Sequence, residues 1–182
     1  IGLPTRVSIG MENFLEKDLY EPIKAYLINM LKKNSSNHHL EITAQGNYGE
    51  TIKHLVRHDI VFSFLKTASP DMTGFVLKEG IDNTIARSSD VESFITVEVK
   101  PDKLKLQDIF QAKMYGDLFY AKYAFLISPE IIGEEIRRLH NRLYILNRFR
   151  DWKVYVGQAI LERSDKSTIK VQDIIWFPET PF

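Results

Sequence analysis

The chain has 182 residues, and its 24 lysines and arginines are balanced by 24 aspartates and glutamates, so its net charge is zero. A neutral chain is not a polycationic protein that coats DNA through many phosphate contacts. A local basic patch would still allow it to touch nucleic acid. The length predicts one domain over residues 1–182, and a charged content of 26% predicts a folded globular protein rather than a disordered one.

Several patterns are missing from the sequence, and each absence excludes a class of protein. The chain has no cysteine, which excludes disulfide scaffolds, thiolate zinc sites, iron–sulfur clusters and cysteine nucleophiles. Its apolar runs are far shorter than the ~20 residues of a membrane helix, and no signal-peptide pattern opens the chain. A P-loop is also absent. We therefore expect a soluble, cytoplasmic protein with no membrane partner and no nucleotide cofactor.

The first half of the chain predicts a helix followed by strands. Apolar residues recur at helical spacing from 15 to 31. Pro22 leaves open whether this segment is one kinked helix or a turn before a helix that starts near the proline. Short strands are predicted at 40–44 and 74–78, and a more convincing one at 59–65.

The second half alternates strands with helices. A β-branched strand is predicted at 94–100, a helix at 104–122, a buried strand at 123–128, a helix from about 129 to 148, and an antiparallel pair at 153–162 and 168–177 with its turn at 163–167. This order predicts an α/β protein with a central mixed β-sheet flanked by helices and a C-terminal β-pair.

The strand at 94–100 carries the most informative polar residues. Side chains two apart on a strand share a face, so Glu98 and Lys100 project together beside Thr96. Such a pair is commonly a surface ion pair. It also suits a metal site, because Mg²⁺ prefers oxygen ligands and takes only one or two protein carboxylates, while a lysine can stabilise charge that develops on a phosphate.

A second acid is found ahead of another predicted strand. Asp59 precedes the apolar run at 60–65. An aspartate in this position is either a turn or capping residue, or the second carboxylate of a metal site. The joint occurrence of Asp59 with Glu98 and Lys100 is more specific than either part alone.

Together these residues resemble the PD-(D/E)XK nuclease superfamily, which includes restriction enzymes, archaeal Holliday-junction resolvases and RecB-type nuclease domains. The resemblance implies a restriction-endonuclease-like core in which Asp59 and Glu98 hold Mg²⁺ or Mn²⁺ and Lys100 acts beside them. His58 stands where the family pattern often has proline. With Asp59 as the first acid, the long gap to Glu98 implies an insertion around 66–93, and the segment around 150–182 becomes a C-terminal extension.

Asp71 is an alternative first acid. It follows Pro70, which makes it a literal match to the family pattern with a shorter gap to Glu98. Asp59 is preferred because the strand predicted after it is the more convincing one, and the choice between the two aspartates stays open at this point.

Two helices supply further candidates. Gln111 and Tyr115 share a helix face and resemble the Gln-x-x-x-Tyr motif of RecB-type members, which implies that Gln111 orients the catalytic site and that Tyr115 lies near nucleic acid. Glu16 falls on the apolar side of the first helix. It either borders that face and stays solvated, or lies near the metal, as a helical glutamate does in many members of the superfamily.

Basic side chains are the candidate DNA contacts. Lysines flank the predicted site at Lys103, Lys105 and Lys113, and arginines mark the later helix at Arg137, Arg138 and Arg142. Arginines of this kind ordinarily form a solvated helix face. In a nuclease they would contact phosphates and position the substrate without reading its sequence.

The sequence thus predicts a metal-dependent nuclease that hydrolyses DNA phosphodiester bonds, in the manner of a structure-specific or resolvase-like endonuclease. The resemblance implies a homodimer with DNA as its partner. The first competing hypothesis is a catalytically inactive nucleic-acid-binding or assembly protein that keeps the fold. The second is an unrelated α/β protein in which Glu98 and Lys100 form only a surface pair.

Overall fold

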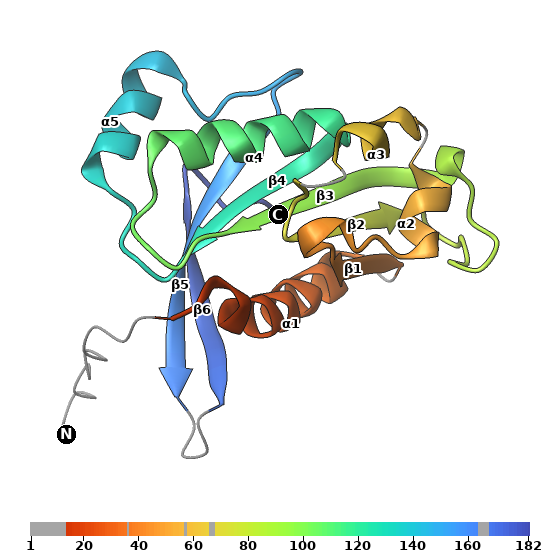
Figure 1. Cartoon of the computed structure of the whole chain (residues 1–182), viewed down its shortest axis with the longest axis horizontal. Coiled ribbons are helices and arrows are strands. Elements are labelled where there is room, and N and C mark those ends of the chain that lie inside the picture. The colour runs from red at the N-terminus through yellow and green to blue at the C-terminus, as the bar shows by residue number, and fades with distance from the viewer. Residues whose placement is uncertain (1–13, 36, 57, 66–67, 164–167) are drawn as a thin grey trace.

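A six-stranded, strongly curled mixed sheet organises the described part of the chain (Figure 1). The computed structural model describes residues 14–35, 37–56, 58–65, 68–163 and 168–182. The strands lie side by side in chain order: β1 (His38–Ile42), β2 (Met72–Leu77), β3 (Val91–Val99), β4 (Ala121–Ser128), β5 (Lys153–Arg163) and β6 (Ile169–Phe177). Neighbouring strands are parallel from β3 to β5 and antiparallel elsewhere. The predicted α/β class and mixed sheet are confirmed.

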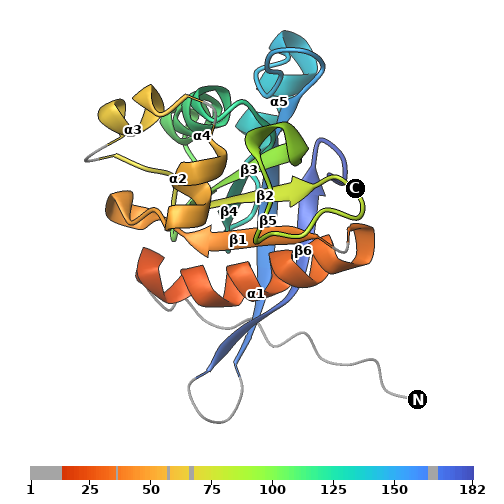
Figure 2. The same cartoon turned by 90° about the vertical axis from the view of Figure 1, so that its right-hand side faces the viewer.

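Helices cover both faces of this sheet. The helices of the described residues are α1 (Glu16–Asn34), α2 (Glu50–Leu55), α3 (Ile60–Phe64), α4 (Leu106–Leu118) and α5 (Glu134–Leu143), with 3₁₀ turns at Ala44–Gly46 and Ser88–Asp90. Figure 2 shows α1 on one face and the other helices on the opposite side. In the described residues, no helix is long and apolar enough to cross a membrane.

The first helix is continuous through its proline. Pro22 lies inside α1, and every fourth residue is buried on both sides of it, at Leu19, Ile23, Leu27 and Leu31. These side chains pack on the sheet, which stabilises the helix even though the proline cannot donate a backbone hydrogen bond. The structure therefore supports one helix rather than a turn followed by a shorter one.

Alternation along β3 decides which residues face which layer. Ile95, Val97 and Val99 are fully buried in the cluster that contains the α1 side chains. Thr96 and Glu98 must then project toward the layer that contains α4. The predicted division of this strand into an apolar face and a face with Glu98 is confirmed.

The predicted strand at 59–65 is wrong, because these residues form α3. Val61 and Leu65 are buried while Ile60 and Phe64 are exposed, which is burial at helical rather than alternating spacing. A short apolar run is compatible with either element, so periodicity could not separate them. Core strand β2 overlaps the short strand predicted at 74–78, inside the range 66–93 that was predicted to be an insertion.

The C-terminal half agrees more closely with prediction. The antiparallel pair of β5 and β6 is confirmed, and the turn predicted at 163–167 lies mostly outside the described residues. Helix α5 is shorter than expected. It ends at Leu143, where Tyr144 adopts a left-handed backbone conformation that stops the helix.

Candidate active site

Two buried acids lie next to each other where β2 begins and β3 ends. Met72 pairs with Val97 in the antiparallel register, so the residue before Met72, Asp71, lies beside Glu98. Asp71 is 5% exposed and Glu98 is 3% exposed. Acids this deeply buried need hydrogen bonds, opposite charge or a metal to offset their lost hydration.

Both oxygens of the Asp71 carboxylate accept hydrogen bonds. The Val99 backbone N–H donates to Oδ2 at 2.7 Å, and the Tyr20 hydroxyl lies 2.6 Å from Oδ1. The backbone carbonyl of Asp71 accepts from the N–H groups of Thr43 and Ala44 at 2.8 and 3.2 Å. The carboxylate is therefore fixed from α1 and from β3, and the backbone of Asp71 is fixed from the segment that follows β1.

The Glu98 carboxylate is only half satisfied. Its Oε1 accepts a 2.7 Å hydrogen bond from Lys100 Nζ, whereas Oε2 is buried without a hydrogen-bond partner among the described residues. A buried polar atom of this kind is rare in folded proteins and needs a specific explanation. An oxygen that is held ready for a cation would supply one.

Lys100 and Glu16 complete the cluster. Lys100 Nζ lies 3.9 Å from Glu16 Oε2, and Glu16 Oε1 lies 2.8 Å from the Tyr20 hydroxyl. Of the two alternatives left open for Glu16, the structure agrees with a position near the other acids, because the first turn of α1 reaches the end of the sheet. The cluster thus contains three acids and one lysine.

The pKa values of the two buried acids, Glu98 and Asp71, are raised. Burial raises the pKa of Glu98 well above its ordinary value, and the charge of Asp71 adds to the effect. Burial also raises the pKa of Asp71, against the lowering effect of its hydrogen bonds with Tyr20 and Val99. A bound cation would favour the ionised form of both acids.

The neighbouring acids together have a larger effect on the pKa of Lys100 than burial has. Burial by itself would lower its pKa, but the hydrogen bond with Glu98 and the charges of Glu98, Glu16 and Asp71 together raise it above the ordinary value. Lys100 therefore carries its proton at neutral pH.

An open cavity of about 430 Å³ reaches Glu16 and Asp71 of the cluster from solvent. Its lining includes Glu16, Lys17, Tyr20, Gln45 and Asp71. Gln45 has a φ of 62°, a left-handed conformation that is uncommon for a residue other than glycine. Strained backbone of this kind is concentrated at functional sites. The sequence did not predict Tyr20 or Gln45 as residues near the site. The one local pattern that could have indicated either of them is the glycine after Gln45, which is typical of a turn.

The donor set fits a metal with few protein ligands. In the described residues, no three Asp, Glu or His side chains lie close enough together to hold a metal by themselves. Mg²⁺ is commonly bound by one or two carboxylates and completes its octahedron with water and phosphate oxygens. Asp71 and Glu98 meet this requirement, because they are adjacent and Glu98 Oε2 has no hydrogen-bond partner in the part of the chain that the structure describes.

Asp59 does not lie with these acids. It is an exposed residue immediately before α3 rather than the head of a buried strand. Lys100 contacts both Glu98 and Glu16, and the backbone N–H of Val99 joins Asp71 to β3. Asp71, the alternative in the sequence, thus occupies the place that was predicted for Asp59.

The α4 motif is present, but its tyrosine is not on the surface. Gln111 Nε2 donates to the Tyr115 hydroxyl at 3.3 Å. Burial raises the pKa of Tyr115, and the nearby charges of Glu98 and Asp71 add to the effect. Tyr115 is only 2% exposed. The prediction that Tyr115 contacts nucleic acid does not agree with this burial, and its ring instead packs behind the site.

The predicted basic contacts fall into two groups. Lys103 and Lys105 are exposed near the start of α4, where Lys103 Nζ pairs with Glu135 at 3.4 Å. Lys113 instead donates to the Ile145 carbonyl at 3.0 Å and joins α4 to the segment after α5.

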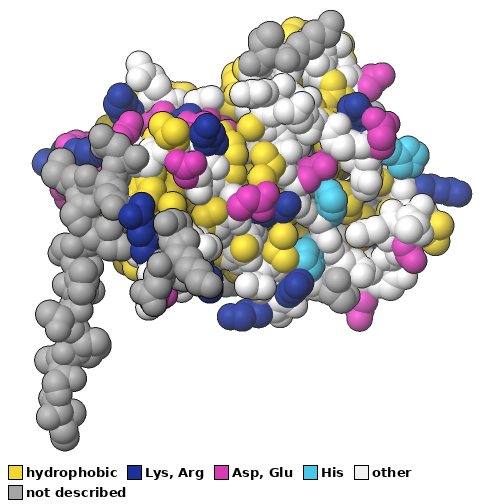
Figure 3. Space-filling view, turned by 60° about the horizontal axis from the view of Figure 1, so that its bottom comes forward, with side chains coloured by type: hydrophobic (Ala, Val, Ile, Leu, Met, Phe, Trp, Pro, Cys, Tyr) yellow, Lys and Arg dark blue, Asp and Glu magenta, His cyan; other side chains and the backbone are white. Residues whose placement is uncertain are grey.

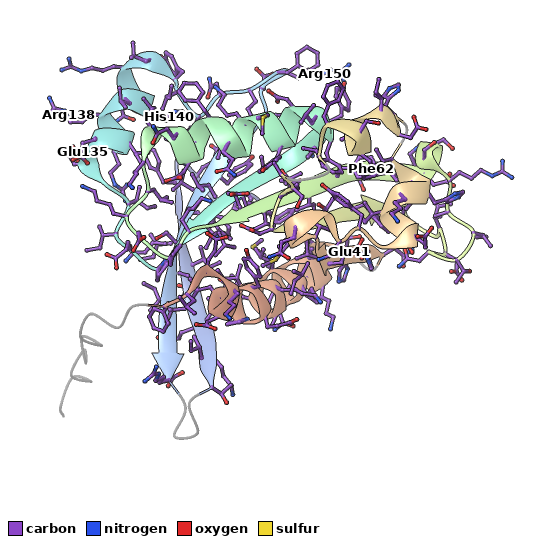
Figure 4. The ribbon with its side chains drawn as sticks, viewed as in Figure 1. Glu41, Phe62, Glu135, Arg138, His140 and Arg150 are labelled. Carbon is purple, nitrogen blue, oxygen red and sulfur yellow. The ribbon has the colours of Figure 1, made fainter. Side chains whose placement is uncertain are left out.

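The arginines of α5 are likewise divided. The guanidinium of Arg137 lies 4.9 Å from the centre of the Phe177 ring, so Arg137 has a packing role. Arg138 and Arg142 are exposed, and Figure 4 shows Arg138 on the same helix as Glu135. On the face shown in Figure 3, acidic and basic side chains are interspersed.

A scan against models of known protein families, a search of curated proteins and a search of solved structures each return no match to this chain.

Proposed function

We propose that this chain is a metal-dependent nuclease that hydrolyses DNA phosphodiester bonds and has a restriction-endonuclease-like core. The observation that carries the proposal is the buried pair of Asp71, just before β2, and Glu98, at the end of β3. Lys100 is bonded to one oxygen of Glu98, and the other oxygen has no hydrogen-bond partner among the residues that the structure describes. An ordinary surface ion pair would not include a glutamate that is 3% exposed beside a second buried acid.

The arrangement also supports the literal family pattern. Pro70-Asp71 comes immediately before β2, and Glu98-x-Lys100 spans the end of the neighbouring strand β3, which is the arrangement that the resemblance implies. With Asp71 as the first acid, β2 becomes part of the core, and the long gap that suggested an insertion is replaced by an ordinary connection between β2 and β3. We therefore assign the role first predicted for Asp59 to Asp71.

Asp71 and Glu98 would hold Mg²⁺ or Mn²⁺, with Glu16 as an outer acid. When bound, such an ion polarises a phosphate and lowers the pKa of a coordinated water. The side chains of this chain do the positioning. Val99 and Tyr20 orient Asp71, Lys100 orients Glu98, and Gln111 fixes the Tyr115 hydroxyl behind them.

Lys100 acts as a positive charge rather than as a general base in this proposal. Its raised pKa keeps the ammonium group protonated, and its Nζ is held 2.7 Å from Glu98. From this position it stabilises negative charge that develops on the phosphate and orients the attacking water.

The DNA backbone would approach from the open side of the cavity, where Lys17 is exposed. Lys103 and Lys105, which are exposed shortly after Lys100 in the chain, would add further phosphate contacts. Exposed Arg138 and Arg142 on α5 extend this set of phosphate contacts, and a homodimer would place two such sites on one DNA molecule. The mixed charges elsewhere on the surface suit local rather than general DNA contact.

Cleavage of DNA tests the proposal directly. The wild type and the single variants Asp71→Asn, Glu98→Gln, Lys100→Ala and Asp59→Asn are incubated with linear, circular, single-stranded and branched DNA and with Mg²⁺ or Mn²⁺. We expect the first three variants to lose activity by about 10²- to 10³-fold, and Asp59→Asn to cut like the wild type.

Two results would contradict this assignment. If the wild type cuts none of these substrates with either metal, the nuclease proposal fails, and retained metal-independent DNA binding would support the inactive nucleic-acid-binding alternative. If Asp59→Asn loses activity while Asp71→Asn keeps it, the assignment of the first acid fails.

A further inference from the structure

Tyr20 connects the helical acid to the strand acid. Its hydroxyl lies 2.6 Å from Asp71 Oδ1 and 2.8 Å from Glu16 Oε1. A tyrosine hydroxyl carries a single hydrogen, so it can donate to only one of the two carboxylates at a time. The shorter contact, the one to Asp71, is the stronger candidate for this donated hydrogen bond.

The support behind Tyr20 is rigid. Tyr20 follows Glu16 by one helical turn and so shares its face of α1. Its neighbours Leu19 and Ile23 are fully buried against the sheet. The hydroxyl is therefore held on a packed helix rather than on a loop, which is how proteins fix the outer hydrogen bonds of a metal site.

Asp71 would rotate without this contact. Val99 holds only Oδ2, and the described hydrogen bond that reaches Oδ1 comes from Tyr20. Two donors on opposite oxygens fix the plane of the carboxylate. Tyr20 itself lines that cavity together with Asp71.

We propose that Tyr20 is the positioning residue of the metal site, which orients Asp71 for the cation, with Glu16 Oε1 beside the same hydroxyl at 2.8 Å. This inference rests on the proposed nuclease function. Hydrogen-bond partners of metal ligands typically contribute about 10- to 100-fold to metal affinity, so loss of the hydroxyl should weaken binding by that factor.

The chain offers a matched control on the same helix. Tyr26 also donates to an aspartate, Asp173 Oδ1, at 2.9 Å, but this pair joins α1 to β6 and is not part of the acid cluster. Tyr20→Phe and Tyr26→Phe therefore each remove one tyrosine–aspartate hydrogen bond from α1. Only the first should change the affinity for a metal.

The experiment measures Mn²⁺ binding by electron paramagnetic resonance of the free ion, in the wild type, Tyr20→Phe, Tyr26→Phe and Glu98→Gln. We expect the dissociation constant for Mn²⁺ to be 10- to 100-fold higher in Tyr20→Phe and within twofold of the wild-type value in Tyr26→Phe. Glu98→Gln should lose Mn²⁺ binding at this site. In DNA cleavage, saturating Mn²⁺ should restore most of the kcat of Tyr20→Phe, with KM for DNA unchanged.

The outcomes separate the two proposals. If Glu98→Gln loses Mn²⁺ but Tyr20→Phe binds it like the wild type, the role of Tyr20 is refuted and the metal site stands. If Tyr20→Phe and Tyr26→Phe weaken binding equally, the effect is one of packing and the positioning role also fails. If the wild type binds no Mn²⁺, or Glu98→Gln binds it equally well, the proposed function itself fails.

Discussion

The backbone N–H of Val99 lies 2.7 Å from Oδ2 of Asp71, so the residue between Glu98 and Lys100 binds the acid of the neighbouring strand. This contact places two carboxylates side by side in a buried position before any cation is present. Their mutual repulsion is part of the folded state, and it has measurable consequences for stability.

Glu98→Gln should stabilise the metal-free protein at pH 8. Burial and the charge of Asp71 raise the folded-state pKa of Glu98, so the folded state binds more protons than the unfolded state between about pH 4.5, the ordinary glutamate value, and the raised pKa. Stability contributed by this group is complete below that window and is lost as pH rises through it. A neutral glutamine removes that loss and should add roughly 1–3 kcal/mol at pH 8.

Thermal unfolding from pH 5 to pH 8 checks this prediction. The wild type should lose melting temperature across the range in the absence of metal and regain it when Mn²⁺ is added, whereas Glu98→Gln should show a flatter profile and no response to Mn²⁺. Equal pH profiles for the two metal-free proteins would show that the pKa of Glu98 is not raised in the folded state.

Gln45→Gly should raise the unfolding free energy by about 1 kcal/mol, because a left-handed φ costs glycine nothing and costs other residues roughly that amount. Gln107→Gly is the control, since Gln107 lies in the first half of α4, where glycine should instead cost up to ~1 kcal/mol. Urea denaturation measures both changes. Destabilisation by Gln45→Gly would mean that the Gln45 side chain stabilises the turn by more than its backbone strain costs.

Gly116→Ala should destabilise the fold by about 1–3 kcal/mol. In most helices this change is favourable, but a Cβ at Gly116 would lie 2.6 Å from Cζ of Arg148 and 2.9 Å from Cβ of Ala124. Arg148 cannot easily move, because it donates to the Ala121 carbonyl and to Asp117. Guanidinium denaturation gives the sign, and a stabilised variant would mean that Arg148 swings away without loss.

Local patterns predicted most of the elements. Helical spacing at 15–31 and β-branched alternation at 94–100 gave α1 and β3 because each carries one clearly apolar face. A helix was also predicted at 104–122, where α4 lies, although its pattern is only weakly amphipathic. The run at 59–65 misled because five apolar residues suit a short helix as well as a strand, and the preference for Asp59 over Asp71 rested on that strand. Strand alternation placed Glu98 and Lys100 together, whereas the position of Glu16 near them was one of two alternatives and came from the resemblance.

Other site residues could not be found in this way. The role of Tyr20 depends on where α1 docks against the end of β2, a long-range contact that no spacing within the helix encodes. Gln45 depends on a turn tied to the chain ahead of β2, where Ser69 Oγ accepts from Gly46 N–H. The burial of Tyr115 depends on which side of α4 packs inward, and its weak amphipathic pattern left that open.

The acid pair depends on the strand register in which Met72 pairs with Val97. Side chains alternate between the two faces of a sheet, so a slip of one residue between β2 and β3 would turn Glu98 toward α1 and bring an apolar valine to Asp71. The chain can form its acid pair in one alignment only. Any affinity for a divalent cation would therefore report that this alignment, and not merely a compact fold, has been reached.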